Sequence, residues 1–378
     1  MKIVVLGAGL VGSAIIQDLA EDKQYEILAV DLNKGSLDRI SGFNGVSTRQ
    51  TDLSDDKVIS NLVSDGDLVI NAVPGYLGFQ TLKQIIQAGK NVVDISFFGE
   101  DAFKLDELAR KKGVTAIVDC GVAPGLCNII AGYVTEKMDQ VDSYLCYVGG
   151  LPEIREWPYE YKVVFSPTDV LEEYTRPARF VENGKEVIYP ALSEVELLDF
   201  PEIGTLEAFN TDGLRSLLLT LDIPNMREKT MRYPGHANLM RVFRESGFFN
   251  QEEVEVDGQN VRPLSLTSRL LFDQWKMQEG DKDLTVMQVI LEGKEGKDQV
   301  IYQYDLVDHY DQEKNVTSMA RTTGYTCTIV ARLLLEGTIP LAGICPPEKI
   351  GEISGLFERL LREYQKRGIN LKETITRK

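Results

Sequence analysis

The first third of the chain alternates short apolar runs with segments whose apolar residues recur at helical spacing. Residues 2–6 (KIVVL) form an apolar run, and residues 10–20 (LVGSAIIQDLA) place apolar side chains three and four positions apart. This pattern predicts a strand followed by a helix. Helical patterns such as 76–89 and 100–112 separate five further apolar runs, which end near Asp31, Leu53, Val73, Ser96 and Gly121. Strands that alternate with helices predict an α/β fold with a parallel, doubly wound sheet.

The pattern changes after about residue 130, where polar and apolar residues alternate in segments such as SYLCYVGGL, KEVIYPAL and VIYQYDLVDHY. Turn signals at Asp257-Gly258 and at 293–296 suit hairpins. Helical spacing recurs near 211–221 and 234–247. These features predict a second, α+β domain with a mostly antiparallel sheet.

Helical patterning returns from about residue 315. TSMARTTGYTCTIVARLLLEG comes first, and GEISGLFERLLREYQKRG follows with one apolar stripe that ends at Gly368. A chain of 378 residues is expected to form about two domains. We therefore predict a first domain at 1–125, a second at 126–314, and C-terminal helices at 315–378.

Three glycines, Gly7, Gly9 and Gly12, separate the first predicted strand from the first helix in a GxGxxG pattern. In this setting the first glycine allows a tight turn, the second lets the backbone approach a pyrophosphate, and the third lets the helix pack closely on the sheet. This is the strand–turn–helix arrangement of a Rossmann dinucleotide-binding domain. A glycine-rich turn without a ligand is the alternative interpretation.

Asp31 ends the second predicted strand, about 20 residues after the glycines, where a carboxylate accepts hydrogen bonds from a ribose and repels a 2′-phosphate. The position favours NAD as cofactor, while the nearby Lys34 and Arg39 leave NADP open. The residues predicted to bind NAD are Gly7, Gly9, Leu10, Val11, Gly12, Asp31, Asp52, Leu53, Val73 and Pro74.

The net charge narrows the range of partners. It is −17, from 58 acidic and 41 basic residues, which disfavours nucleic acid and membrane surfaces. No run approaches the roughly 18 apolar residues of a membrane-spanning helix, and the first apolar run already belongs to the glycine motif, which leaves no room for a signal peptide. Five cysteines without a CxxC pair and two histidines predict neither a disulfide framework nor a metal site. We therefore expect a cytoplasmic protein.

Polar residues follow the last two strands of the predicted parallel sheet. Asp94 and Ser96 lie at the end of one strand, and Asp119 and Cys120 at the end of the next. Ligands of such sheets bind beyond the carboxyl ends of the strands, and a carboxylate is costly to bury without a partner. These residues are therefore candidates for a ligand site, with capping of the following turns as the alternative.

A second candidate group lies in KTMRYPGHANLM, which brings Arg232, Tyr233 and His236 together. A guanidinium can grip a carboxylate in two places, and an imidazole can carry a proton near neutral pH. A helix that leads into a turn would explain the same residues without a ligand.

Longer motifs run in order through nearly the whole chain: GAGLVGSAI with Asp31, NAVPG, VDIS, DCGVAPGLCNIIAGY, YVGGLP, the FSP-to-EYTRPA segment, RYPGH and SMARTTGYT. On these motifs the chain resembles the saccharopine dehydrogenase-like family, and within it the enzymes that oxidise the ε-amino group of lysine. The resemblance implies a Rossmann domain, an α+β domain that holds the substrate and builds a homodimer, and C-terminal helices that return to the Rossmann domain. It also implies NAD-dependent oxidative deamination of L-lysine, with release of ammonia and cyclisation of the resulting aldehyde.

The resemblance and the polar strand ends together suggest individual roles. A group must first accept a proton, because an ammonium nitrogen has no lone pair with which to expel a hydride. We expect Asp119 to be this base, with His236 second and Asp94 third. Arg232 matches a substrate-carboxylate arginine of the saccharopine reductases. The other predicted substrate contacts are Tyr233, Ser96 and Cys120.

The sequence departs from the saccharopine reductases at Ala123, because the segment that matches 122–125 usually reads LDPG there and reads VAPG here. The departure disfavours saccharopine and carboxynorspermidine as substrates. The cations that a tricarboxylate needs could still come from Arg155, Arg176, Arg179, Arg227 and Arg241. A non-catalytic NAD-binding sensor or scaffold is the alternative from another class, and the polar strand ends argue against it.

Overall fold

The structure, a computed structural model, describes residues 1–378, except for the side chains of residues 56 and 57. The chain forms two compact units, which we call unit 1 (residues 1–137 with 320–370) and unit 2 (residues 138–319 with 371–378). The chain therefore passes between the units at 137/138, 319/320 and 370/371. The boundaries predicted from the sequence lie at 125/126 and 314/315, and none was predicted near residue 370.

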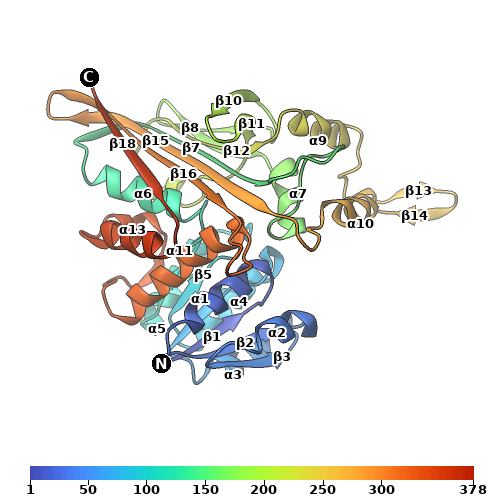
Figure 1. Cartoon of the computed structure of the whole chain (residues 1–378), viewed down its shortest axis with the longest axis vertical. Helices are drawn as coiled ribbons and strands as arrows, with labels where there is room; N and C mark the ends of the chain where they lie inside the picture. Colours follow the sequence, from blue (N-terminus) through green and yellow to red (C-terminus); the bar gives the residue numbers. More distant parts are fainter. The chain divides into compact units, whose positions relative to one another are not determined.

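Unit 1 contains a seven-stranded sheet in the order β17-β6-β5-β4-β1-β2-β3, and every neighbouring pair is parallel. Figure 1 labels β1, β2, β3 and β5 of this sheet. The order reverses between β1 and β4, which is where a doubly wound sheet binds a dinucleotide. This arrangement confirms the predicted fold class. The strands are β1 (Lys2–Leu6), β2 (Glu26–Asp31), β3 (Val46–Gln50), β4 (Leu68–Asn71), β5 (Val92–Asp94), β6 (Thr115–Ile117) and β17 (Gly343–Cys345).

Helices connect the strands of unit 1 and bury their apolar faces against the sheet. Val4 and Val69 on the sheet and Leu82 and Ile85 on α4 are fully buried in one cluster. Helix α6 belongs to this unit because it packs against α12, where a Cβ on Gly132 would lie 2.0 Å from the carbonyl oxygen of Glu348. The helices are α1 (Leu10–Ala20), α2 (Lys34–Ile40), α3 (Asp56–Val63), α4 (Gly75–Gln87), η1 (Ala102–Leu105), α5 (Asp106–Lys112), α6 (Leu126–Thr135), α11 (Ser318–Leu335), α12 (Glu348–Gly351) and α13 (Leu356–Lys366).

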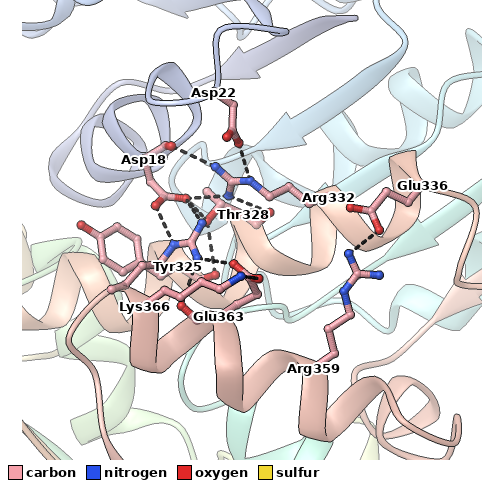
Figure 2. A network of polar contacts seen from close by, with 10 residues as sticks. Asp18, Asp22, Tyr325, Thr328, Arg332, Glu336, Arg359, Glu363 and Lys366 are labelled. Atoms are coloured by element: carbon pink, nitrogen blue, oxygen red, sulfur yellow. Dashed lines mark hydrogen bonds and ion pairs between the residues drawn. The ribbon is translucent and has the colours of Figure 1, made fainter.

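A buried carboxylate joins the C-terminal helices to α1. Asp18 is 1% exposed and accepts hydrogen bonds from Thr328 at 2.6 Å, Arg332 at 2.6 Å and Arg367 at 2.7 Å. Figure 2 shows Arg332 reaching from α11 to both Asp18 and Asp22. Residues from the end of the chain thereby hold the helix that follows the glycine motif.

Unit 2 is built on a nine-stranded sheet. Its main path is β10-β11-β12-β7-β15-β16-β18, with β8 beside β12 and β9 beside β8. The β12–β7 pair is parallel and the other pairs are antiparallel, as predicted. The strands are β7 (Gln140–Pro152), β8 (Ala178–Glu182), β9 (Lys185–Tyr189), β10 (Glu196–Phe200), β11 (Gly204–Asn210), β12 (Met226–Arg232), β15 (Asp283–Glu295), β16 (Asp298–His309) and β18 (Leu371–Arg377), with β13 (Val254–Val256) and β14 (Gln259–Val261) as a separate hairpin.

Two segments differ from the sequence prediction. The helix predicted at 211–221 is reduced to α8 (Leu217–Thr220), because Thr211 donates a hydrogen bond to Glu228 and Asp212 accepts one from Arg179. Residues 371–377 form β18 beside β16, although they fall in the segment predicted as C-terminal helices. The other helices of unit 2 are α7 (Pro167–Thr175), α9 (His236–Glu245) and α10 (Pro263–Trp275).

Candidate functional site

The glycine loop between β1 and α1 can be formed only by glycine at two of its three positions. A Cβ on Gly7, whose φ is +99°, would lie 2.3 Å from the carbonyl oxygen of Ala72, and a Cβ on Gly12 would lie 2.2 Å from that of Gly7. A Cβ on Gly9 would meet no described atom within 4 Å. Gly7 and Gly12 therefore allow close packing, whereas Gly9 leaves open space before the N-terminus of α1. This space fits a dinucleotide pyrophosphate, which the helix N-terminus would stabilise.

Asp31 lies at the end of β2 beside the same loop. One of its carboxylate oxygens accepts a hydrogen bond of 2.7 Å from the backbone N–H of Ala8, and the other accepts one of 2.7 Å from that of Asn33. These bonds fix a negative charge next to the glycine loop, where it suits ribose hydroxyls and opposes a 2′-phosphate. Lys34 and Arg39 are exposed, and Arg39 donates to Ser36 at 3.2 Å.

The other predicted cofactor residues lie near the carboxyl ends of β3 and β4 or in the loop itself. Asp52 is exposed, and the backbone N–H of Ser54 donates to it at 2.9 Å and lowers its pKa. Leu53 and Val73 are buried, and Pro74 is exposed directly before α4. Leu10 and Val11 begin α1, and Leu10 is 44% exposed beside the open space at Gly9.

A buried polar cluster occupies the carboxyl ends of β4 and β5. Asp94 accepts hydrogen bonds from the side-chain amide of Asn71 at 2.8 Å and from the backbone N–H of Ser96 at 2.6 Å. Asn71 and Asp94 are both fully buried, and Ser96 is 3% exposed. Burial raises the pKa of Asp94 to about 7, because it removes water from the charged form more than the two hydrogen bonds compensate.

Asp119 follows β6 in the neighbouring position of the sheet. It is 6% exposed and its φ is +53°, a left-handed conformation that is uncommon outside glycine. The next residue, Cys120, donates its backbone N–H to the carbonyl oxygen of Asp94 at 2.9 Å. Its thiol is fully buried, and burial raises the pKa of that thiol. Unit 1 therefore brings together four predicted site residues: Asp94, Ser96, Asp119 and Cys120.

A tight turn connects this cluster to α6. Gly125 has a φ of +134°, and a Cβ there would lie 1.9 Å from the carbonyl oxygen of Gly121. The amide side chain of Asn128 accepts a hydrogen bond from the N–H of Gly125 at 3.1 Å and donates one to Glu348 at 3.2 Å. Some of the polar groups at the start of α6 are thus satisfied by hydrogen bonds within the chain.

The other predicted group is held together in unit 2. Arg232 ends β12 with its side chain 3% exposed, donates to Glu173 at 2.8 Å, and lies 4.7 Å from the ring centre of Tyr161. The hydroxyl of Tyr233 donates to the carbonyl oxygen of Pro152 at 2.9 Å. A substrate carboxylate that bound Arg232 would therefore compete with Glu173.

His236 begins α9 and uses both ring nitrogens inside unit 2. Nδ1 lies 3.0 Å from the carbonyl oxygen of Tyr159, and Nε2 lies 2.9 Å from the hydroxyl of Tyr174. Because a carbonyl only accepts, Nδ1 carries the proton and Nε2 accepts from Tyr174. Burial, reinforced by the charge of Arg232, lowers the pKa of His236 to about 3. A neutral, fully engaged imidazole of this kind is a weak proton acceptor.

A cavity of about 310 Å³ lies beside the N-terminus of α9 in unit 2. Tyr159, Tyr233 and Pro234 give it an aromatic and apolar lining, with Glu160 and Asn238 as polar neighbours.

Within the described part of the chain, no three His, Cys, Asp or Glu side chains are grouped as metal ligands. No helix in that part is long and apolar enough to cross a membrane.

Two residues that bond to predicted site residues were not predicted from the sequence. Asn71 is the side-chain donor to Asp94, and Glu173 is the ion-pair partner of Arg232. Asn71 ends a strand, as Asp94 does, so its position at the edge of the sheet was a usable signal. Glu173 is 59 residues from Arg232, and no local pattern connects the two.

Comparisons with known proteins identify the family. Residues 3–117 match the Saccharopine dehydrogenase NADP binding domain, and residues 121–369 match the Saccharopine dehydrogenase C-terminal domain. The chain belongs to the saccharopine dehydrogenase family. The match over residues 3–117 identifies the N-terminal part as an NAD(P)-binding domain.

The individual relatives that match this chain have low sequence identity to it. Saccharopine dehydrogenase [NADP(+), L-glutamate-forming] of Schizosaccharomyces pombe is 25% identical over 99% of both chains, and carboxyaminopropylagmatine dehydrogenase of Synechocystis is 22% identical over 92% of both. Alpha-aminoadipic semialdehyde synthase of Bos taurus is 24% identical over 96% of this chain but only 47% of its own length, so the chain spans about half of that relative.

Solved structures share the fold. Apo saccharopine dehydrogenase of Saccharomyces cerevisiae superposes with a TM-score of 0.79 at 19% identity, over 99% of both chains. Homospermidine synthase of Legionella pneumophila, solved with NAD, has a TM-score of 0.65 at 14% identity, over 99% of this chain and 91% of its own.

Proposed function

We propose that this protein is a lysine 6-dehydrogenase, an NAD-dependent enzyme that oxidises the carbon bearing the ε-amino group of L-lysine. Lysine, NAD⁺ and water would give the 6-semialdehyde of 2-aminoadipate, ammonium, NADH and a proton. The semialdehyde would then cyclise, with loss of water, to 1-piperideine-6-carboxylate. Family membership and the polar strand ends of unit 1 support a dehydrogenase, and the charges of unit 2 support this substrate.

The observation that carries the choice of substrate is the pairing of the arginines in unit 2. Of the five arginines that a tricarboxylate could use, four are paired: Arg155 with Glu160, Arg176 with Glu172, Arg179 with Asp212, and Arg227 with Glu182 and Glu194. Arg241 is exposed and is not among these pairs. Saccharopine carries three carboxylates and needs several available cations, whereas lysine needs one, for which Arg232 would exchange its partner Glu173. The net charge of −17 also favours a substrate with two ammonium groups.

The choice of NAD rests on Asp31. Its carboxylate is held by two backbone N–H groups, so it cannot swing away from a 2′-phosphate without losing both hydrogen bonds. Replacing Asp31 by serine should therefore improve the use of NADP relative to NAD, as measured by kcat/KM for each. Bound NAD supplies the hydride acceptor, and the chain supplies position and proton transfer.

Within unit 1, Asp119 supports the role of base. Its side chain is 6% exposed, whereas that of Asp94 is fully buried, so Asp119 is the carboxylate that a ligand at this edge could reach. It would accept a proton from the substrate ammonium and leave a lone pair on nitrogen. Water would then release ammonium from the imine. The low pKa of His236 disfavours that residue as the base.

The test is absorbance of reduced nicotinamide after the purified protein is mixed with a dinucleotide and an amine. L-lysine, saccharopine and 1,5-diaminopentane are supplied separately, each with NAD and with NADP. We expect reduction with lysine and NAD, and less than about a tenth of that rate with the other pairs. Ammonium release equal to the NADH formed would identify a deamination.

The alternatives give different results in the same assay. Reduction with saccharopine would assign the chain to the saccharopine reductases and would mean that the paired arginines exchange partners. Reduction with the diamine would remove the need for a carboxylate anchor. NADH binding without turnover on any of the amines would favour a non-catalytic sensor or scaffold. Homodimer formation and cytoplasmic location stay predictions, which light scattering and cell fractionation can check.

A further inference from the structure

We propose that Asn71 and Asp94 are positioning residues that act on the reaction through Asp119. The inference rests on the proposed dehydrogenase function and deepens it, because it assigns a role to two residues that a substrate does not reach. Asn71 and Asp94 end the neighbouring parallel strands β4 and β5, and both are fully buried.

Asp94 is held at three points. The amide of Asn71 donates to Oδ2 at 2.8 Å, the backbone N–H of Ser96 donates to Oδ1 at 2.6 Å, and the carbonyl oxygen accepts from the N–H of Cys120 at 2.9 Å. The last bond fixes the peptide that directly follows Asp119. Since Asp119 has a sparsely populated left-handed φ, its conformation depends on such surrounding contacts.

Asn71 is itself oriented by the fold. Its Nδ2 atom also lies 3.4 Å from the carbonyl oxygen of Gly78 on α4, and a Cβ on Gly78 would come within 2.7 Å of the side chains of Ser96 and Phe98. The absence of a side chain at Gly78 thus lets α4 close over the cluster. Two polar atoms of this cluster, Oδ1 of Asn71 and Oγ of Ser96, are buried and have no hydrogen-bond partner among the described residues.

The titratable groups that face Asp94 are Asp119 and the thiols of Cys120 and Cys327. The charge of Asp119 raises the pKa of Asp94, in addition to the larger effect of burial. Burial raises the pKa of both thiols, so they stay neutral near pH 7. The charge of Asp119 thus reaches Asp94, which ends the neighbouring strand of the sheet.

This arrangement makes Asp94 a charge that can change in the neutral range without contact with the substrate. An ionised Asp94 places a negative charge beside Asp119, and a neutral Asp94 does not. Asn71 sets the balance, because its amide donates to the ionised carboxylate and so favours the charged form.

The first test is the pH profile of kcat/KM for the amine that the enzyme oxidises. If the ionisation of Asp94 affects the reaction, the profile should show an inflection near pH 7 that Asp94→Asn removes. Asn71→Leu should move this inflection to higher pH, because Asp94 then ionises less readily. Asn91→Ala is the matched control: Asn91 accepts from the N–H of Thr115 at 2.9 Å, before the start of β5, and its loss should leave the inflection unmoved. Overlapping profiles for Asp94→Asn and the unaltered enzyme would overturn the proposal.

The second test needs no turnover, so it separates this inference from the proposed function. Carbon-13 NMR of protein labelled at the aspartate carboxyl should show a carboxyl that titrates near pH 7. That signal should vanish in Asp94→Asn, titrate at higher pH in Asn71→Leu, and titrate at lower pH in Asp119→Asn. If no amine is oxidised but these shifts occur, the proposed function fails and the coupled pair stands. If Asp119→Asn leaves the titration in place, the pair is not coupled and the inference fails.

Discussion

Arg367 donates a hydrogen bond of 2.7 Å to the carboxylate of Asp18, a residue 349 positions earlier in the chain. The same carboxylate accepts from Arg332 at 2.6 Å. Asp18 is 1% exposed, and both arginine side chains are only slightly exposed, so the three charges depend on one another. The glycine-loop helix of unit 1 is therefore anchored by residues from the C-terminal helices.

Removing this carboxylate should destabilise unit 1. Asp18→Ala leaves two nearly buried guanidiniums without their shared anion, which should lower the free energy of unfolding by about 3–5 kcal/mol. Asp22→Ala removes a more exposed partner of Arg332 and should cost about 1 kcal/mol or less. Urea unfolding of the two variants would measure the difference. Equal losses would mean that burial of Asp18 contributes little.

The stability of unit 1 should also depend on the ionisation of Asp94. Because the pKa of Asp94 is about 7 in the folded protein and 3.8 ordinarily, the folded state binds this proton more tightly than the unfolded chain. The favourable contribution is therefore present at low pH and is lost as pH rises from about 4 to about 7. Asp94→Asn should gain up to a few kcal/mol relative to the unaltered protein over that interval. Urea unfolding at pH 5 and pH 8 would measure the gain, and a constant difference would contradict the assignment.

Gly9 and Gly12 of the nucleotide loop should respond differently to alanine. Gly9→Ala places a methyl group in open space, so the protein should fold normally but bind NADH at least about tenfold more weakly. Gly12→Ala places a methyl 2.2 Å from a backbone oxygen and should lower the melting temperature as well. Quenching of protein fluorescence by NADH, together with thermal unfolding, distinguishes the two effects. Unchanged NADH affinity in Gly9→Ala would show that the cofactor phosphates do not bind at this loop.

Asp119→Asn tests the proposed base. The amide keeps the size of the side chain but accepts no proton, so kcat should fall by about 100-fold or more while the Kd for NAD stays within about twofold. Steady-state kinetics and NADH titration provide the two numbers. Retained turnover would show that another group takes the proton.

Arg232 and Glu173 test the substrate anchor. Glu173→Gln removes the anion that competes for Arg232, so the KM for lysine should fall, by about threefold or more. Arg232→Ala should raise that KM by about tenfold or more, with a smaller change in kcat. If neither substitution moves KM, Arg232 is a structural residue of unit 2 and does not contact the substrate.

Local patterns were sufficient to predict the parallel sheet and its nucleotide loop. The strands β1, β4 and β5 are short apolar runs, of which β4 and β5 end in the polar residues Asn71 and Asp94, and the glycine spacing places the turn between β1 and α1. The edge strand β17 lies more than 200 residues after β6, its neighbour in the sheet, and so falls outside the alternating pattern of the first third of the chain. Strand β18 is largely exposed and forms because the edge of β16 offers it hydrogen-bond partners, which no local pattern reveals.

The candidate site was likewise predictable only in part from local sequence patterns. Asp94 and Asp119 were predicted as candidates because a carboxylate at the end of a buried strand is unusual. The partners that determine what they can do, such as Asn71, come from other strands and depend on the register of the sheet. The pairing of Arg232 with Glu173 likewise joins residues 59 positions apart, on β12 and α7, and no local pattern predicts it.

The long separation between Asp18 and Arg367 has a consequence for how the protein is made. Synthesis proceeds at roughly 5–20 residues per second, so helix α1 leaves the ribosome on the order of 20–70 seconds before its last partner does. For most of that interval the carboxylate of Asp18 has neither arginine beside it, and until residue 367 is made it lacks one of them. The nucleotide-binding unit therefore cannot be completed as an early, independent part of the nascent chain. Shortened translation products that lack residue 367 should not accumulate as stable, cofactor-binding fragments.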